Sequence, residues 1–308
     1  MSTEDSQAQQ GVSAGHSGRL LLVVGIAWFL CLVQFVGAIL TGSLALLFDT
    51  VHVLTDALGL TAAFIAARLA TRPASHKRTW GWKRVEVISA MFQAAILLGV
   101  GAFILVEALE RFFNPSPIPG REVLIFGLVG LAGNVAMVCI LAGGDRKNFN
   151  MRAAFLEVIN DALGSCAVII SAGLISLFGW YRADALLAIL IAGLIIPRTL
   201  KLLQETLSVL LESTPKNLDL QKLQEHLEAQ PHVLAVHDLH ASQIASDLPV
   251  LTAHVVLKDE CFTSGHSVEI LKELQHCVHQ HFEVSIRHST FQLEPQSLQG
   301  SEHYANLP

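Results

Sequence analysis

Long apolar segments fill most of the chain up to about residue 210, and polar residues dominate after it. Each apolar segment has the roughly 20 residues that a helix needs to cross a ~30 Å hydrocarbon core. Short connections with Gly, Pro, Asn and Ser separate them, as turns do. The pattern predicts a six-helix transmembrane domain at 19–210, after a disordered polar tail at 1–18. The six helices are expected near residues 19–40, 44–70, 86–112, 122–144, 152–177 and 182–205.

The pattern changes to short helical and strand periods after the last apolar segment. Leu220, Leu223 and Leu227 have helical spacing within residues 218–230. Residues 233–241 and 250–258 alternate apolar and polar side chains, as half-buried strands do. A second helix at 267–282 and a last strand at 283–294 complete an αββαβ order. We expect a small α+β domain at 211–294 with its helices on one face of the sheet, and a tail at 295–308.

The composition is that of a membrane protein. Mean hydropathy is +0.51 and only 15% of the residues are charged, far from the balance of a soluble domain. The net charge of −6 gives no basic surface, so we expect no nucleic-acid partner. The five cysteines have no CxxC spacing, which favours free thiols over disulfides.

The basic residues predict the orientation of the spans. An even number of spans places both termini on one side, and Lys and Arg are enriched in cytoplasmic loops. The connections after the second and fourth spans are rich in basic residues, so both termini and the C-terminal domain are expected in the cytoplasm. Short loops favour a prokaryotic plasma membrane. The basic residues in these two connections are Arg72, Lys77, Arg78, Lys83, Arg84, Arg146 and Lys147.

Four ionisable residues lie deep within two of the apolar segments. His52 and Asp56 are four residues apart in the second span, and Glu157 and Asp161 are four apart in the fifth. Residues at this spacing share one helix face. Such groups cost several kcal/mol in a bilayer and normally face a partner or water. The four side chains fit either a tetrahedral divalent-metal site or a buried hydrogen-bonded network; a shared cation relieves the repulsion among three carboxylates.

Three further polar residues lie within the spans. Asp49 is three residues before His52 and is expected to support the site or its access path. Gln34 and Asn134 are uncharged, and interhelical hydrogen bonding is their expected role.

Several segments resemble the cation diffusion facilitator family, the divalent-metal/proton antiporters of the zinc, cadmium and cobalt type. GAILTGSLALLFDTVHVLTDALGL and NMRAAFLEVINDALGS are similar to the signatures of its second and fifth spans, and HKRTWGWKRVEVISA to the segment before its third span. VHDLHASQIASDLPVLTAHVVL and IRHSTFQLE resemble its cytoplasmic domain. The resemblance covers about residues 19–294. It implies metal transport at His52, Asp56, Glu157 and Asp161, protons as counter-ion, a homodimer with a metallochaperone-like domain, and no resident cofactor.

This sequence departs from the family pattern at two positions. Glu157 stands where the zinc branch usually has histidine, and Gln34 where it often has glutamate. An anionic oxygen in place of a nitrogen makes the site harder and more negative. Zn²⁺, Cd²⁺ and Co²⁺ remain candidates, and selectivity for Mn²⁺ or Fe²⁺ is the alternative.

The resemblance also implies a regulatory zinc site in the C-terminal domain. His240, His254 and His288 are the candidate ligands, and His237 and Glu294 stand at matching polar positions. His276, His279 and His281 lie on a late helical turn, where we expect simple solvent exposure.

Two other classes of function compete with transport. An intramembrane metallohydrolase would show HExxH or an equivalent base, and neither this motif nor GxSxG occurs in the sequence, so we expect no enzyme. A metal-sensing membrane protein that does not transport remains an alternative, which a transport assay separates.

Overall fold

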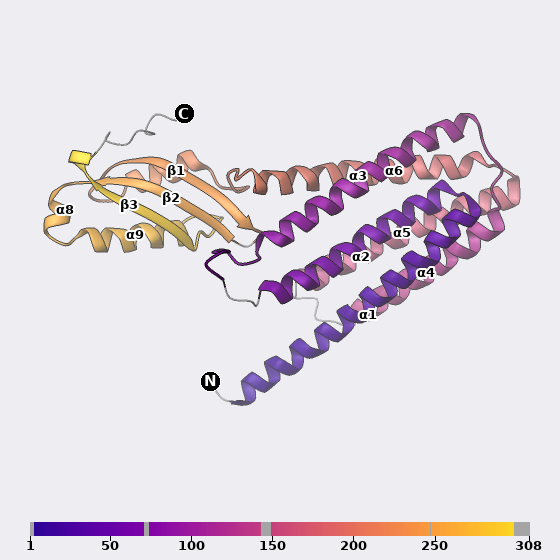
Figure 1. Cartoon of the computed structure of the whole chain (residues 1–308), viewed down its shortest axis with the longest axis horizontal. Helices are drawn as coiled ribbons and strands as arrows, with labels where there is room; N and C mark the ends of the chain where they lie inside the picture. Colours follow the sequence, from indigo (N-terminus) through magenta and orange to yellow (C-terminus); the bar gives the residue numbers. More distant parts are fainter. Residues whose placement is uncertain (1–2, 71–73, 143–148, 247, 299–308) are drawn as a thin grey trace. The chain divides into compact units, whose positions relative to one another are not determined.

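The chain forms two compact units in a computed structural model (Figure 1). The structure describes residues 3–70, 74–142, 149–246 and 248–298, without the side chains of residues 3–21, 60, 62–64, 66–70, 141–142 and 149–160. The first unit comprises Met1–Ile65 and Ser89–Leu203, and the second comprises Ala66–Ile88 and Gln204–Pro308. The long helices lie mainly in the first unit and the sheet in the second.

Six long helices agree with the six apolar segments of the sequence. Among the described residues, five stretches are long and apolar enough to span a membrane: Leu22–Thr41, Arg84–Phe113, Gly120–Ile140, Asp161–Phe178 and Arg182–Leu210. The second helix has the length of a span and carries Asp49, His52 and Asp56. The helices are α1 (Thr3–Thr41), α2 (Leu44–Ala70), α3 (Arg84–Phe113), α4 (Gly120–Ala142), α5 (Phe149–Phe178) and α6 (Arg182–Leu210).

Helix α1 begins upstream of its predicted start. The sequence predicts a disordered tail at residues 1–18, whereas the helix runs from Thr3 without interruption. Ala, Gln and Glu in this segment are good helix formers. Extending an existing helix avoids the cost of nucleating a new one, so the apolar span supports helix in the polar residues before it.

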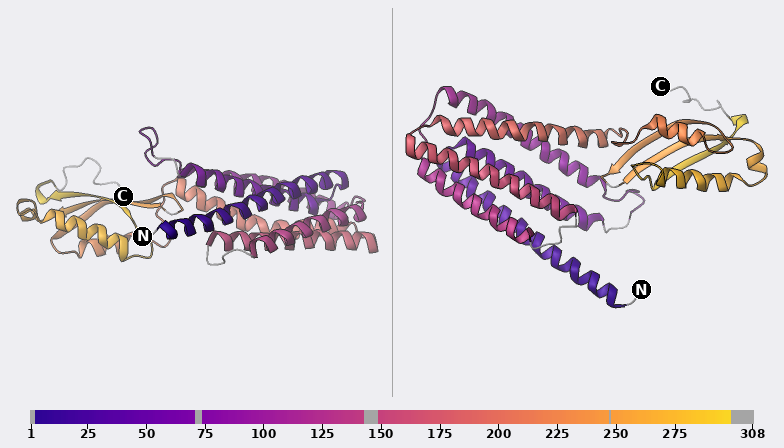
Figure 2. Two further views of the ribbon diagram at one scale, coloured as in Figure 1. Left: turned by 90° about the horizontal axis from the view of Figure 1, so that it is seen from below. Right: turned by 180° about the vertical axis from the view of Figure 1, so that it is seen from behind.

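The helices of the first unit share one apolar core. Helix α4 packs against both α1 and α5 (Figures 1 and 2). The core joins Phe48 of α2, Ile104 of α3, Val123 of α4, Val168 of α5 and Ala192 of α6. Many large apolar side chains point outward instead, which suits a surface facing lipid.

Hydrogen bonds to Asp184 stabilise the turn between α1 and α2. It is buried in the first turn of α6, where it accepts hydrogen bonds from Ser43 Oγ and from the Leu44 backbone N–H at 2.7 Å. Gly42 has a φ of 67°, a conformation that glycine adopts without strain. Arg111 of α3 donates to its carbonyl oxygen at 2.7 Å. The Leu44 N–H at the start of α2 and the Gly42 carbonyl oxygen just before it therefore both have hydrogen-bond partners.

The C-terminal domain (residues 204–298) contains a three-stranded sheet in the order β1-β2-β3. Strand β1 is antiparallel to β2, and β2 is parallel to β3. The observed order confirms the αββαβ prediction, with one short extra helix, α8. The elements are α7 (Leu220–Glu228), β1 (Val233–Ala245), β2 (Leu248–Leu257), α8 (Glu260–Thr263), α9 (Ser267–Gln280), β3 (His288–Pro295) and a 3-10 turn (Gln296–Leu298).

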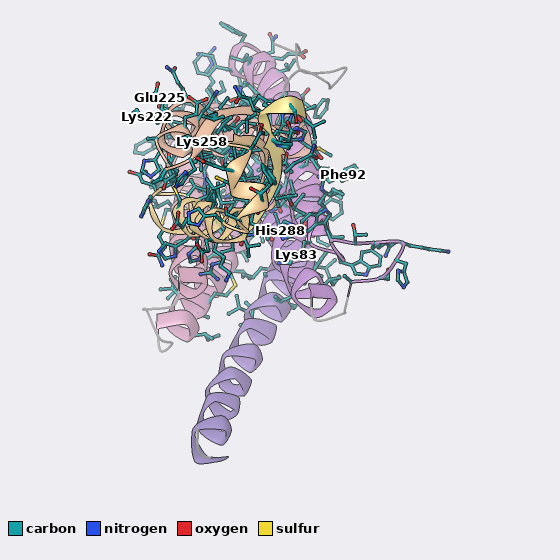
Figure 3. The ribbon with its side chains drawn as sticks, turned by 90° about the vertical axis from the view of Figure 1, so that its left-hand side faces the viewer. Lys83, Phe92, Lys222, Glu225, Lys258 and His288 are labelled. Carbon is teal, nitrogen blue, oxygen red and sulfur yellow. The ribbon has the colours of Figure 1, made fainter. Side chains whose placement is uncertain are left out.

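The two longer helices of this domain cover one face of the sheet. Leu227 of α7 and Leu274 of α9 pack with Leu251 and Val255 of β2 in a single core. Alternate residues of a strand point to opposite faces, so His254 lies on the uncovered face. The outer side of α7 is polar and exposed, as the labelled Lys222 and Glu225 show in Figure 3.

The segment before α3 belongs to the second unit and contacts the C-terminal domain. The Trp80 ring lies edge-on to the ring of His288, with centroids 4.8 Å apart. Arg84 donates to Glu212 Oε1 at 2.7 Å. Lys83 of this segment and His288 of the C-terminal domain are both labelled in Figure 3. The imidazole of His288 therefore lies against the Trp80 ring.

Candidate metal centres

Helices α2 and α5 bring His52, Asp56 and Asp161 together. His52 Nε2 lies 3.3 Å from Asp161 Oδ1 and 3.6 Å from Asp56 Oδ2. One ligand atom from each residue lies within 4.8 Å of the other two. Asp161 is buried, and His52 and Asp56 are partly exposed. The structure thus places three of the four residues of the predicted intramembrane site around one point.

Glu157, the fourth predicted ligand, lies one helical turn before Asp161 on α5. Its side chain falls outside the described set. The spacing of four residues puts it on the same helix face as Asp161. Metal ligation by Glu157 therefore stays a prediction.

The three described side chains have the chemistry of a divalent-cation site. Zinc accepts imidazole nitrogen at about 2.0–2.1 Å and carboxylate oxygen at about 2.0–2.2 Å. Two carboxylates this close in a poorly solvated setting repel each other unless a proton or a cation lies between them. The cluster can hold a cation from two helices at once.

A hydrogen-bonded network supports the cluster from one side. Asp49 Oδ2 accepts from Gln34 Nε2 at 2.8 Å and from Ser165 Oγ at 3.3 Å. Asn134 Nδ2 donates to Ser165 Oγ at 3.2 Å, so α1, α2, α4 and α5 are all joined. Gln34 and Asn134 make the interhelical hydrogen bonds that the sequence predicts. Gly164 leaves room for this network, since a Cβ there would stand 2.6 Å from Asp49 Oδ1.

A second cluster lies on the uncovered face of the C-terminal sheet. His237 Nε2 is 3.3 Å from Glu294 Oε2, and His254 Nδ1 is 2.9 Å from Glu294 Oε1. Gln292 Nε2 also donates to Glu294 Oε1 at 2.8 Å. Glu294 is only 3% exposed, so a carboxylate is buried between two imidazoles. The three residues come from three adjacent strands and offer one oxygen and two nitrogens to a metal.

Of the three histidines predicted for the regulatory site, only His254 belongs to one of the candidate metal clusters among the described residues. His254 belongs to the cluster with His237 and Glu294. A break in the β1 register after His237 turns His240 toward Asp238, with His240 Nε2 2.9 Å from Asp238 Oδ1. His288 begins β3, six residues from Glu294, a distance of about 20 Å along a strand. His254 Nε2 also lies 3.7 Å from Asp238 Oδ2, so the Asp238 carboxylate lies beside both His240 and His254, whereas His288 lies apart from them.

A third cluster joins His226, Cys277 and His281 in the helical layer of the same domain. His281 is exposed, as the sequence predicts, but its proximity to His226 and Cys277 was not predicted. The spacing of four between Cys277 and His281 at the end of a predicted helix was the available indication. His226 could be added only from the packing of α7 on α9.

Comparison with protein families covers nearly the whole chain. Residues 20–211 match the family described as "Cation efflux transmembrane domain". Residues 215–296 match "Cation efflux protein, cytoplasmic domain". The two matches correspond to the long helices and to the C-terminal α+β domain.

Individual relatives are similar over most of their length. The "Cadmium, cobalt and zinc/H(+)-K(+) antiporter" of Bacillus subtilis is 36% identical over 268 residues, 86% of this chain and 85% of that protein. The "Metal cation efflux system protein CzcD" of Cupriavidus metallidurans is 34% identical over 96% of this chain and 92% of its own. "Zinc transporter ZitB" of Escherichia coli is 35% identical, with 94% and 91% covered. The chain belongs to the cation efflux family, the cation diffusion facilitators.

Proposed function

We propose that this protein exports a divalent cation from the cytoplasm in exchange for protons, through a site made by His52, Asp56, Glu157 and Asp161. The observation that carries the proposal is the 3.3 Å approach of His52 on α2 to Asp161 on α5. This contact brings α2 and α5 together at their ionisable residues. The names of the relatives, which include zinc, cadmium and cobalt, support this class of substrate.

Metal and protons compete for the same groups in this mechanism. Carboxylates must be deprotonated and histidine neutral to bind a metal. When the site faces a more acidic compartment, protons neutralise Asp56 and Asp161 and charge His52, which weakens the site and releases the ion. The same residues, deprotonated and facing the cytoplasm, bind the next ion. The competition couples export to proton entry without a separate proton path.

The ligand atoms of the intramembrane site suit divalent cations that bind both nitrogen and oxygen. With Glu157 the site has one nitrogen and three carboxylates, which accepts Zn²⁺, Cd²⁺ or Co²⁺ and is harder than a site with two histidines. Export of Zn²⁺, Cd²⁺ or Co²⁺ is the primary proposal, and preference for Mn²⁺ or Fe²⁺ is the alternative that Glu157 raises.

The protein acts as a homodimer in the plasma membrane, with both termini in the cytoplasm. Similarity to the cytoplasmic domain of the family and the distribution of basic residues support this arrangement. His237, His254 and Glu294 are the best placed residues for a regulatory metal in the C-terminal domain.

Metal uptake into proteoliposomes under an imposed pH gradient tests the transport proposal. Inside-out vesicles with the wild type should accumulate Zn²⁺, Cd²⁺ or Co²⁺, and Asp161→Ala should abolish this. Glu107→Gln is the matched control, because Glu107 pairs with Arg111 on α3 outside the cluster. Folded wild type that moves no metal under a gradient would rule out the antiporter and favour a metal sensor that does not transport.

A further inference from the structure

We propose that His226, Cys277 and His281 form an additional metal site in the C-terminal domain, one that takes a thiophilic divalent cation such as Zn²⁺ or Cd²⁺. The three residues lie in the helical layer, whereas His237, His254 and Glu294 lie on the sheet. The two clusters share no residue. The inference goes beyond transport and holds whether or not the intramembrane site moves metal.

The geometry is close to that of a tetrahedral site. His226 Nε2 lies 3.1 Å from His281 Nδ1, and one ligand atom from each of the three residues lies within 4.8 Å of the others. Zinc bonds of about 2.0–2.1 Å to nitrogen and 2.3 Å to sulfur put the nitrogens about 3.3 Å apart and nitrogen and sulfur about 3.6 Å apart. Side-chain shifts of about 1 Å would therefore bring the three ligands to an ion, with water in the fourth position.

Two elements of the fold hold these ligands in place. Cys277 and His281 are four residues apart at the C-terminal end of α9, so they share a face. Cys277 is 2% exposed, and its side chain is part of the domain core. His226 comes from α7, and its ring makes T-shaped contacts with the rings of His281 and Phe282 at centroid distances of 5.3 and 5.5 Å. The Phe282 ring thus lies against the His226 imidazole.

The imidazole pair offers two nitrogens to one point. His226 Nε2 and His281 Nδ1 lie 3.1 Å apart and face each other, and each ring nitrogen can bind a metal. A metal bound here would replace the proton of the Cys277 thiol, as in other thiolate sites.

The donor set distinguishes this site from the other two clusters. Thiolate and imidazole favour Zn²⁺ and Cd²⁺ over Mn²⁺, which prefers oxygen ligands. The intramembrane cluster and the sheet cluster contain no sulfur. A bound ion here would also link α7 to α9, the two helices that cover the sheet.

Cobalt binding to the purified, metal-free full-length protein provides the test. Co²⁺ bound by thiolate gives a sulfur-to-metal charge-transfer absorption that histidine and carboxylate ligands do not give. The wild type should develop this band, saturating at one equivalent per chain, and Zn²⁺ should displace it. Cys277→Ser should lack the band. Cys261→Ser is the matched control, since Cys261 is equally buried in the same domain and lies outside the cluster.

Two further variants assign the nitrogen ligands. His226→Gln and His281→Gln should each weaken Co²⁺ binding at this band by about tenfold or more while the far-ultraviolet circular dichroism stays unchanged. Folded wild type without the band at saturating Co²⁺ would overturn the proposal, as would loss of the band in Cys261→Ser to the same extent as in Cys277→Ser. The readout needs no membrane or gradient, so its failure is separate from failure of transport.

Discussion

His52 Nε2 lies 3.3 Å from Asp161 Oδ1, although 109 positions separate the two residues in the chain. A single imidazole nitrogen thus faces a carboxylate of its own helix, Asp56, and one of a second helix. Metal bonds tolerate deviations of only about 0.2 Å. A small displacement of α2 relative to α5 is therefore enough to assemble or dismantle the site, which suits a transporter that must bind and release the same ion.

Replacing Glu157 tests which ions the intramembrane site prefers. Glu157→His exchanges an anionic oxygen for a nitrogen, so preference should move from Mn²⁺ toward Zn²⁺ and Cd²⁺ by about tenfold, which is about 1.4 kcal/mol. Initial uptake rates for each ion in proteoliposomes measure this ratio. Glu157→Gln is the control, since it removes the negative charge of Glu157 without introducing an imidazole nitrogen. Unchanged ion ratios in Glu157→His would remove Glu157 from the set of ligands.

Gly164 should be required for tight metal binding although it carries no ligand. In Gly164→Ala the new Cβ would stand 2.6 Å from Asp49 Oδ1, and Asp49 interacts electrostatically with His52 and Asp161. Displacing Asp49 breaks its hydrogen bond from Gln34, so metal affinity should fall by about 10- to 100-fold.

Gly173→Ala is the matched control for this variant. It lies on the same helix, and a Cβ there meets nothing within 4 Å. Both substitutions raise helix propensity equally. Equal affinities of the two variants, measured by equilibrium metal binding, would show that Asp49 does not support the site.

Hydrophobic length and periodicity predicted most of the fold. The apolar segments predict the bounds of α2 to α6 to within five residues, because a membrane span is a long pattern with clear polar ends. The spacing of four residues in "HVLTD" and "EVIND" was enough to place each pair on one helix face. Contact between the two pairs depends on how α2 packs on α5, which periodicity does not encode.

Local irregularity explains what the sequence missed in the C-terminal domain. Simple alternation along β1 does not reveal the break in register after His237, where Asp238 has a φ of 49°. After this break His240 lies beside Asp238, which also approaches His254, and His237 is the residue of β1 that lies beside Glu294. The cluster at Cys277 was not predicted for a different reason, since one of its three residues, His226, lies on another helix.

Glu294 should be required for metal binding on the sheet, and His240 should not. Glu294→Gln keeps the size of the side chain but removes the charge between His237 and His254, so one bound Zn²⁺ per chain should be lost. Equilibrium dialysis of the full-length protein measures the stoichiometry. His240→Gln should keep the wild-type value, because its ring is exposed and paired with Asp238. Loss of an ion in His240→Gln with none lost in Glu294→Gln would reverse this assignment.

The stability that the Asp219 N-cap gives to α7 should decrease at acidic pH. Asp219 accepts hydrogen bonds from the backbone N–H groups of Lys222 at 3.2 Å and Gln221 at 3.1 Å, and the Lys222 ammonium lies 3.4 Å away. The Lys222 backbone N–H, with smaller contributions from the Lys222 side chain and the Gln221 N–H, lowers the pKa of Asp219 from its ordinary value. The cap therefore stabilises α7 fully above the unfolded-state pKa of about 3.9 and is lost as pH falls through the lower folded value.

Hydrogen exchange of the α7 amides in the full-length protein checks this prediction. Asp219→Ala should exchange faster than wild type at pH 7, because two N–H groups of the first turn lose their acceptor. The difference should stay constant as pH falls to about 4 and shrink only below it. Asp219→Asn is the control, since asparagine caps as well as aspartate and does not titrate. If the difference between wild type and Asp219→Ala already vanished near neutral pH, another group would control the stability of α7.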